Sequence, residues 1–278
     1  RDEYFLKQKD AAVPALEKAI ALGDKSKEMY NVLGRTYVDS RDWQKALDAY
    51  TKGDPNATDQ MKIGQVEVFL GNNDAADSVY RALIAHDSTS SEAKFALGEL
   101  GKLRFRLKDY PGTIAVLKRR IALDPNDDEA YYYTGLSYKE MKQIPEAVAA
   151  LRQAATLAPA KGDRQFWLGV VLSQADSSDA ADEAFQRSVA ADSTSRNAAI
   201  ALQQLGYHQL LHKNWVGAIG MLERSVVIDD KSVQTLIWLA QAYQNSGNRV
   251  KAVEYYHKVL QLQPGQPDAA KGLKTLGA

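Results

Sequence analysis

Apolar residues recur along the chain at the spacing of amphipathic helices, and residues 128–161 show this pattern most clearly. In the first part of this segment Tyr131, Thr134, Tyr138 and Met141 are three or four residues apart, which places them on one face of a helix. In the second part a stripe of alanine, valine and leucine repeats at the same spacing. The segment is therefore predicted to fold as two consecutive amphipathic helices.

Glycine and proline mark the boundaries inside this segment. Pro145 opens the second helix, where its missing N–H would be unpaired anyway, and Pro159 ends that helix. Gly135 lies on the apolar face of the first helix, where a glycine costs about 1 kcal/mol relative to alanine. We expect the close approach of the second helix, which carries the small residue Ala147, to offset that cost. The prediction is a tightly packed helix–turn–helix unit.

The same unit recurs from one end of the chain to the other. One helix pair buries too few apolar side chains to offset the entropy of ordering it, so neighbouring units must stack. Residues 1–26 are expected to begin inside a first helix and to carry Pro14 early in the second, where proline would bend it. The predicted repeats are 27–56, 57–90, 91–127, 128–161, 162–195, 196–232 and 233–266, with a partial repeat at 1–26 and a closing helix at 267–278.

Repeats 91–127 and 196–232 begin with three extra residues, so their positions are counted from residues 94 and 199. Each repeat then has a small residue at the eighth position and, except for Thr113, at the twentieth. Large residues lie near the fourth and twenty-fourth positions, and several repeats have proline near the thirty-second. This pattern resembles the tetratricopeptide repeat. The resemblance covers essentially the whole chain and implies an all-α, right-handed superhelical solenoid of about seven to eight helix–turn–helix repeats. The small residues that it assigns to packing are Gly34, Gly64, Gly101, Gly135, Gly169 and Gly206 on first helices, and Ala46, Ala76, Ala147, Ala181, Ala218 and Ala252 on second helices.

The sequence also repeats over a longer distance that spans three helix pairs. Repeats 57–90 and 162–195 are offset by 105 residues and share 12 of 34 positions, including a DAAD and a DSTS segment in each. We interpret this as duplication of a three-repeat block, in which 57–161 gave rise to 162–266. The two DSTS segments are predicted to act as helix N-caps in place of the proline stop.

Composition narrows the function further. The chain has 35 basic and 35 acidic residues, so no charge bias favours nucleic acid. Cysteine is absent, which excludes disulfides, thiolate metal sites and a cysteine nucleophile. No apolar run is long enough for a bilayer, and no phosphate loop, nucleophile elbow or dinucleotide fingerprint is present. We therefore expect no enzymatic activity, no cofactor, no metal and no membrane insertion. Absent cysteine and an N-terminal Arg1 instead of methionine favour the bacterial cell envelope or an extracellular location.

The resemblance also implies where a partner would bind. In this family the concave face is lined mainly by first-helix positions, at which the chain has apolar and aromatic residues. Tyr132, Phe166 and Tyr207 are favoured because they share a line with polar neighbours, and Trp167 and Trp238 are further candidates. The alternative is that these side chains pack between helices. The predicted groove residues are Arg35, Phe69, Lys102, Tyr132, Phe166, Tyr207, Ile237 and Gln241.

A carboxylate clamp, by which some members of this family hold chaperone C-termini, needs lysine and asparagine in a set pattern. Only Asn31 and Arg35 resemble it, so we expect no clamp. A basic cluster at 102–108 and 118–120 would suit a phosphate or an acidic peptide, but we favour a solvated face balanced by nearby aspartates.

Two further segments resemble metal sites. His208 and His212 are one helical turn apart, but Gln209 stands where a zinc protease has glutamate, so a histidine satisfied by its neighbours is favoured. Residues 124–129 resemble the start of a calcium loop but lack the required glycine and final acid, so a capped turn is favoured.

These observations predict a non-enzymatic adaptor that holds a peptide or helix of another protein in its concave groove. The alternative is a self-assembling protein, in which the half-repeats at 1–26 and 267–278 of successive copies join head to tail into oligomers or filaments.

Overall fold

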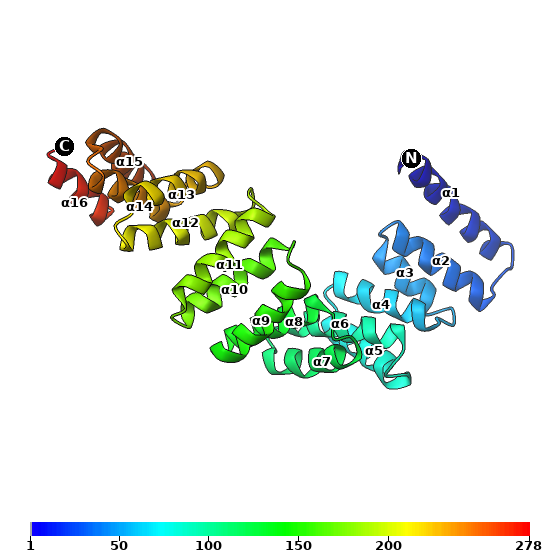
Figure 1. The fold of residues 1–278 in the computed structure, drawn as a ribbon. Helices are drawn as coiled ribbons and strands as arrows, with labels where there is room; N and C mark the ends of the chain where they lie inside the picture. Colours follow the sequence, from blue (N-terminus) through cyan, green and yellow to red (C-terminus); the bar gives the residue numbers. More distant parts are fainter. Residues whose placement is uncertain (1) are drawn as a thin grey trace. The chain divides into compact units, whose positions relative to one another are not determined.

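A computed structural model describes the backbone of residues 2–278 and the side chains from residue 12 onward, and over this range every regular element is an α-helix (Figure 1). The helices are α1 (Asp2–Ala21), α2 (Lys27–Asp39), α3 (Trp43–Tyr50), α4 (Ala57–Phe69), α5 (Asn73–His86), α6 (Ser91–Arg106), α7 (Tyr110–Leu123), α8 (Asp128–Glu140), α9 (Ile144–Leu157), α10 (Gly162–Gln174), α11 (Ser178–Ala191), α12 (Arg196–Leu211), α13 (Trp215–Ile228), α14 (Val233–Asn245), α15 (Arg249–Leu262) and α16 (Pro267–Leu276).

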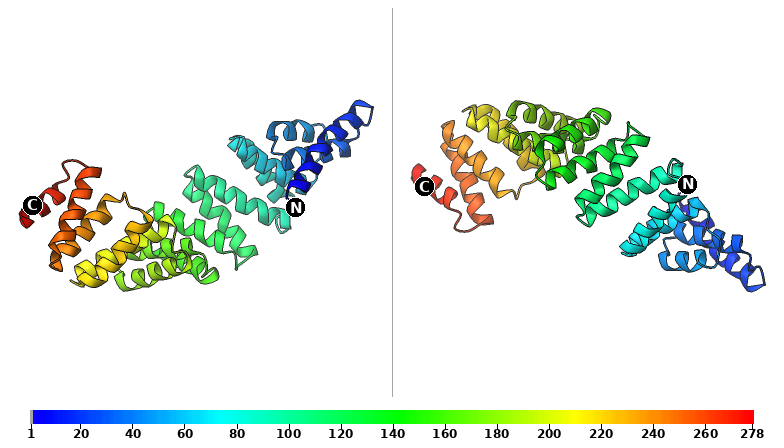
Figure 2. Two further views of the ribbon diagram at one scale, coloured as in Figure 1. Left: turned by 90° about the horizontal axis from the view of Figure 1, so that it is seen from above. Right: turned by 90° about the horizontal axis from the view of Figure 1, so that it is seen from below.

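These helices form two compact units, one ending at Ser137 and one beginning at Tyr138. Within each unit, consecutive helices pack as pairs, and Figure 2 shows the pairs from two further directions. First helices also contact the next first helix, as α4 contacts α6 and α12 contacts α14. Among the described residues of either unit, no second helix contacts the next second helix. The array is therefore closed on its first-helix side and open on its second-helix side, and the chain is an all-α solenoid of helix pairs.

The packing glycines lie against the large residue at the twenty-fourth position of the same repeat. A Cβ added to Gly64 would be 2.4 Å from the Tyr80 ring, and one added to Gly101 would be 2.4 Å from Leu117. Gly34, Gly169 and Gly206 face Tyr50, Phe185 and Leu222 in the same way. Gly135 is buried, and the alanines at positions 46, 76, 147, 181, 218 and 252 expose none of their surface. The glycine thus makes room for a large side chain on the facing helix.

The turn inside each repeat needs one residue with left-handed backbone. That residue is Gly71 in one repeat and Gly247 in another, with φ of 81° and 84°. Arg41, Lys108, Lys142, Asp176 and Lys213 occupy the equivalent position with φ between 53° and 62°. Glycine adopts this conformation without steric cost, whereas in any other residue the Cβ atom crowds the backbone. Five repeats therefore contain a strained turn residue.

The N-terminal helix differs from the expectation. Residues 1–26 were predicted to contain the end of one helix and then a second, but α1 is one continuous helix with Pro14 in its interior. No glycine or second proline lies between residues 2 and 21 to break it, and lysine, glutamine, leucine and alanine there are good helix formers. Pro14 alone does not end the helix.

Candidate functional site

A cleft of about 220 Å³ opens on the first-helix side of the first unit, between α4, α6 and α8. Phe69 forms one wall and exposes 66% of its surface, which is unusual for so large an apolar side chain. Its ring stacks on Trp43, with centroids 4.8 Å apart and planes 12° from parallel, so it is held in place while exposed. We call this the Phe69 cleft; it is lined by Gln65, Val68, Phe69, Glu99, Lys102, Arg106 and Tyr133.

Charged side chains lie beside the apolar wall of the Phe69 cleft. The Lys102 ammonium is 2.5 Å from Glu99 and 3.4 Å from Glu129. Partial burial alone would lower the pKa of Lys102, but the two carboxylates hold that pKa above its ordinary value. Arg106 is exposed and has no ion-pair partner among the described residues. The cleft therefore offers an aromatic wall, a neutralised lysine and one available guanidinium.

Tyr133 belongs to this site although the sequence pattern pointed to its neighbour. The Tyr133 ring meets Phe105 edge to face at 5.3 Å, and Phe105 meets Tyr110 at 5.7 Å. Tyr132 is half-buried and packs edge-on against Tyr133. The sequence does contain a signal for Tyr133: an aromatic residue recurs at the sixth position of the repeat, as Tyr133, Trp167 and Trp238.

In the second unit, aromatic side chains on first helices make contacts at separate places. Tyr207 stacks on Trp238, with centroids 4.3 Å apart and planes at 22°. The Lys139 ammonium lies 4.8 Å from the centre of the Trp167 ring, a cation–π distance. Gln241 lines a separate depression of about 190 Å³ beside α16. The second unit thus repeats the chemistry of aromatic side chains on first helices without gathering them in one cleft.

Two predicted groove residues are buried. Phe166 exposes 4% of its surface and lies 6.1 Å from Phe185, and Ile237 exposes 2% inside the core of the C-terminal helices. A partner could not contact either side chain without repacking the core. We therefore remove both residues from the proposed surface, because the fifth position of these repeats points toward the paired helix.

Arg35 is also engaged within the array. Its Nε and one terminal nitrogen each donate to Asp59 at 2.7 Å, and Asp59 exposes none of its surface. The hydrogen bond to Asp59 raises the pKa of Arg35 above its ordinary value. Because this pair joins α2 to α4, Arg35 stabilises repeat stacking and does not offer a free charge to a partner.

Several side chains of the predicted basic cluster are paired with neighbouring carboxylates. Arg104 in the predicted basic cluster pairs with Asp77 at 3.1 Å, and Arg120 pairs with Asp127. Asp77, Glu99, Glu129 and Asp127 thus balance part of this cluster. Asp127 also caps the N–H of Ala130 at 2.9 Å, which is the capped turn predicted for 124–129.

His208 makes a short contact with a neighbouring helix. Its Nδ1 lies 2.5 Å from Asp182 on α11, and His212 is exposed. In the part of the chain that the structure describes, no three potential metal ligands of the histidine, cysteine, aspartate or glutamate type come together. The same residues include no helix with the length and apolar character needed to cross a membrane.

Comparison with known proteins agrees with this architecture. Sequence models of the tetratricopeptide repeat match residues 1–59 and 61–128, 129–160, and 233–266, which together are more than half of the chain. The chain belongs to the tetratricopeptide repeat family. The prediction of this family and of the all-α solenoid is thereby confirmed.

The similar proteins share the fold at low sequence identity. The BBSome complex member BBS4 of Bos taurus is 26% identical over 187 residues, which are 66% of this chain and 36% of BBS4. The matched part thus spans about a third of that relative's length. YrrB, described as a tetratricopeptide repeat protein with an unusual peptide-binding site, has 20% identity and a TM-score of 0.61, covering 70% of this chain and 97% of YrrB.

A third comparison extends along nearly the whole chain. The C-terminal part of a tetratricopeptide repeat-containing protein from Cytophaga hutchinsonii has 17% identity and a TM-score of 0.61, covering 98% of this chain and 97% of that one. At such identities the likeness to solved structures shows the fold alone.

Proposed function

We propose that the chain is a non-enzymatic scaffold that binds a peptide or helix of another protein on its first helices, with the Phe69 cleft as the principal contact. The observation that carries this proposal is Phe69 itself, a large aromatic side chain held rigid by Trp43 and exposed beside charged groups. Rigid aromatic anchors beside polar groups are the usual centres of protein interfaces. The peptide-binding site named for YrrB supports a binding role for this fold.

The chemistry of the cleft indicates what the partner presents. An apolar side chain would pack against Phe69 and Tyr133, and a carboxylate would pair with the guanidinium of Arg106. Lys102 is already neutralised by Glu99 and Glu129, so it contributes less to charge recognition. We therefore propose a partner segment that combines an apolar residue with an acidic one.

Peptide selection tests this proposal. Displayed random peptides would be selected on the wild-type chain and then measured against the Phe69→Ala variant. We expect Phe69→Ala to weaken the affinity for the selected peptides by about thirtyfold, which is the loss typical of an aromatic hot spot. The matched control is Val227→Ala, which also removes an exposed apolar side chain, 86% accessible, outside the cleft. Selected peptides that bind both variants as they bind the wild type would refute the proposal.

The alternative of head-to-tail assembly has less support. The exposed side of α16 carries Lys271, Lys274 and Thr275, a polar surface that does not favour burial against another helix. Measuring the mass in solution against concentration would decide between the two: the scaffold predicts a constant mass, and assembly predicts a ladder of species.

A further inference from the structure

The open side of the array, where second helices do not meet, contains a groove in the first unit between α5 and α7 over α6. Its volume is about 620 Å³. Arg81 comes from α5, Arg104 from α6 and Arg119 from α7, so guanidinium groups belong to all three helices around it. We call it the Arg119 groove; besides the arginines, it is lined by Ile84, Leu100 and Val116 and by the small residues Ala85 and Ala115.

The Arg119 groove has an excess of positive charge. No carboxylate lines it, and Asp77 beside it is shared by Arg104 at 3.1 Å and Arg81 at 3.6 Å. Arg119 is exposed and makes no ion pair among the described residues. One carboxylate therefore faces three guanidinium groups, and an acidic partner would supply the missing charge.

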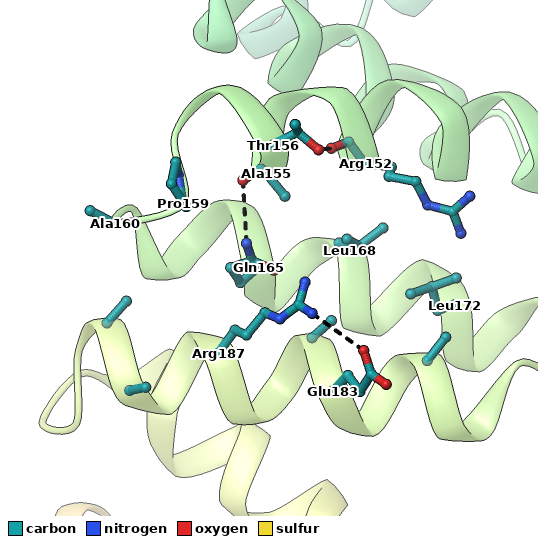
Figure 3. A pocket seen from close by; sticks show the side chains of 14 residues that line it. Arg152, Ala155, Thr156, Pro159, Ala160, Gln165, Leu168, Leu172, Glu183 and Arg187 are labelled. Carbon is teal, nitrogen blue, oxygen red and sulfur yellow. Dashed lines mark hydrogen bonds and ion pairs between the residues drawn. The ribbon is translucent and has the colours of Figure 1, made fainter.

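The second unit contains an equivalent groove between α9 and α11 over α10, with a volume of about 820 Å³ (Figure 3). Arg152 and Arg187 enter it from opposite sides. Arg152, like Arg81, directly follows the large buried residue of its second helix, and Arg187, like Arg119, comes two residues after it. We call it the Arg152 groove.

Most of the floor of the Arg152 groove is also apolar, although Thr156, Gln165 and Glu183 line it as well. Ala155, Leu168 and Ala184 lie where Ile84, Leu100 and Val116 lie in the first groove. Arg187 is 3.4 Å from Glu183, but Arg152 is exposed and has no ion pair among the described residues. The same arrangement of two arginines across an apolar floor thus occurs once in each unit.

We propose that these two grooves bind acidic peptide segments, with an apolar side chain on the floor and carboxylates against the flanking arginines. The apolar floor favours a peptide over a nucleic-acid backbone, which would present only phosphate there. The Arg119 groove and the Phe69 cleft both use α6 but are lined by different residues, so the chain would hold acidic segments on two separate surfaces.

Calorimetry on the full chain tests the proposal with a synthetic peptide of about 14 residues in which leucine pairs alternate with glutamate pairs. The titrations use the Phe69→Ala chain, so that the Phe69 cleft does not contribute. We expect two sites per chain that weaken in high salt, because salt screens the charge pairs. Arg81→Glu with Arg119→Glu removes one site, Arg152→Glu with Arg187→Glu removes the other, and all four together remove both. Ala115→Trp fills the first groove without changing charge and also removes one site; Ala115 is exposed, so this variant keeps its fold.

Controls separate the grooves from charge alone and from the Phe69 cleft. Lys94→Glu with Arg224→Glu makes the same charge change at exposed residues outside both grooves and should leave two sites. The unaltered chain should show one further site, in the Phe69 cleft, which Phe69→Ala removes. Absence of that site would count against the proposed function alone, so either proposal can fail without the other. The inference is overturned if both arginine pairs can be reversed without loss of binding. It is equally overturned if a peptide with serine for leucine binds as well, or if single-stranded DNA occupies the grooves in place of the peptide.

Discussion

At the scale of single residues, the pairing of a glycine with a large side chain fixes how closely two helices approach. Gly64 and Tyr80 show this most clearly, because Tyr80 is completely buried and cannot move aside. The Tyr80 hydroxyl has no hydrogen-bond partner in the structure, and burial raises the pKa of Tyr80 above its ordinary value. The ring therefore occupies this position for its shape, and its polar atom is tolerated there.

Two glycine substitutions are predicted to have opposite effects. Gly64→Ala should lower the free energy of unfolding by about 1–3 kcal/mol, because the new Cβ overlaps the Tyr80 ring. Gly220→Ala, at an exposed position of helix α13 with no atom within 4 Å of the new Cβ, should raise it by about 0.5–1 kcal/mol. Urea denaturation measures both. Equal effects of the same sign would contradict the packing role of Gly64.

Individual residues also show the limits of sequence reasoning. Phe69 and Lys102 were both predicted for the groove, and both line one cleft. Phe166 and Ile237 were predicted on the same grounds but are buried. The sequence gives the angle of a residue around its own helix, whereas burial also depends on where the paired helix crosses it. That crossing is set by side chains from several helices, so it could not be read from one repeat.

At the scale of the helix pair, most boundaries follow from local chemistry that the sequence displays. Ser90 and Ser195 in the two DSTS segments accept hydrogen bonds from Ala93 and Ala198, as expected for N-caps. The continuity of α1 was not predictable from the repeat pattern, because the pattern describes where turns fall in complete repeats. The left-handed turn residue was also missed, since five of seven repeats have no glycine there.

The strained turn residues predict a stabilising change. Lys108 is exposed with φ of 62°, so Lys108→Gly should raise the free energy of unfolding by up to about 1 kcal/mol. Gly71→Ala places a side chain in the same conformation and should lower it by about 1 kcal/mol. Thermal unfolding of both variants checks this. A destabilised Lys108→Gly would show that its side chain contributes more than its backbone strain costs.

The DSTS turns predict a dependence on pH. The backbone N–H groups of Thr89 and Thr194 donate to Asp87 and Asp192 and lower the pKa of both carboxyls. Because the folded pKa lies below the unfolded value of about 3.9, this contribution is present above that value and is lost as pH falls through the folded pKa.

We expect the double variant Asp87→Asn, Asp192→Asn to melt at a lower temperature than the wild type at pH 6, and the difference to vanish near the acid end of the titration. Calorimetric melting temperatures across this range provide the measurement. A difference that persists unchanged in acid would mean that the carboxylate charge has no part in these turns.

At the scale of the whole molecule, each helix pair contacts only its neighbours, so disturbances should remain local. We predict that Gly64→Ala accelerates amide hydrogen exchange in α4, α5 and α6 and leaves α12 to α15 unchanged. Exchange followed by mass spectrometry resolves these segments. Faster exchange throughout the chain would instead indicate that both units unfold as one cooperative structure.

The separation of successive second helices has a consequence for how such a chain changes over evolutionary time. A groove on that side is lined by two successive second helices and the first helix between them, and the backbones of those second helices do not pack directly on each other. A mutation that remodels one groove therefore does not alter backbone packing between second helices, whereas a mutation on the continuous first-helix side affects two adjoining repeats. New binding specificities can accumulate on the open side one repeat at a time, while the closed side conserves the architecture.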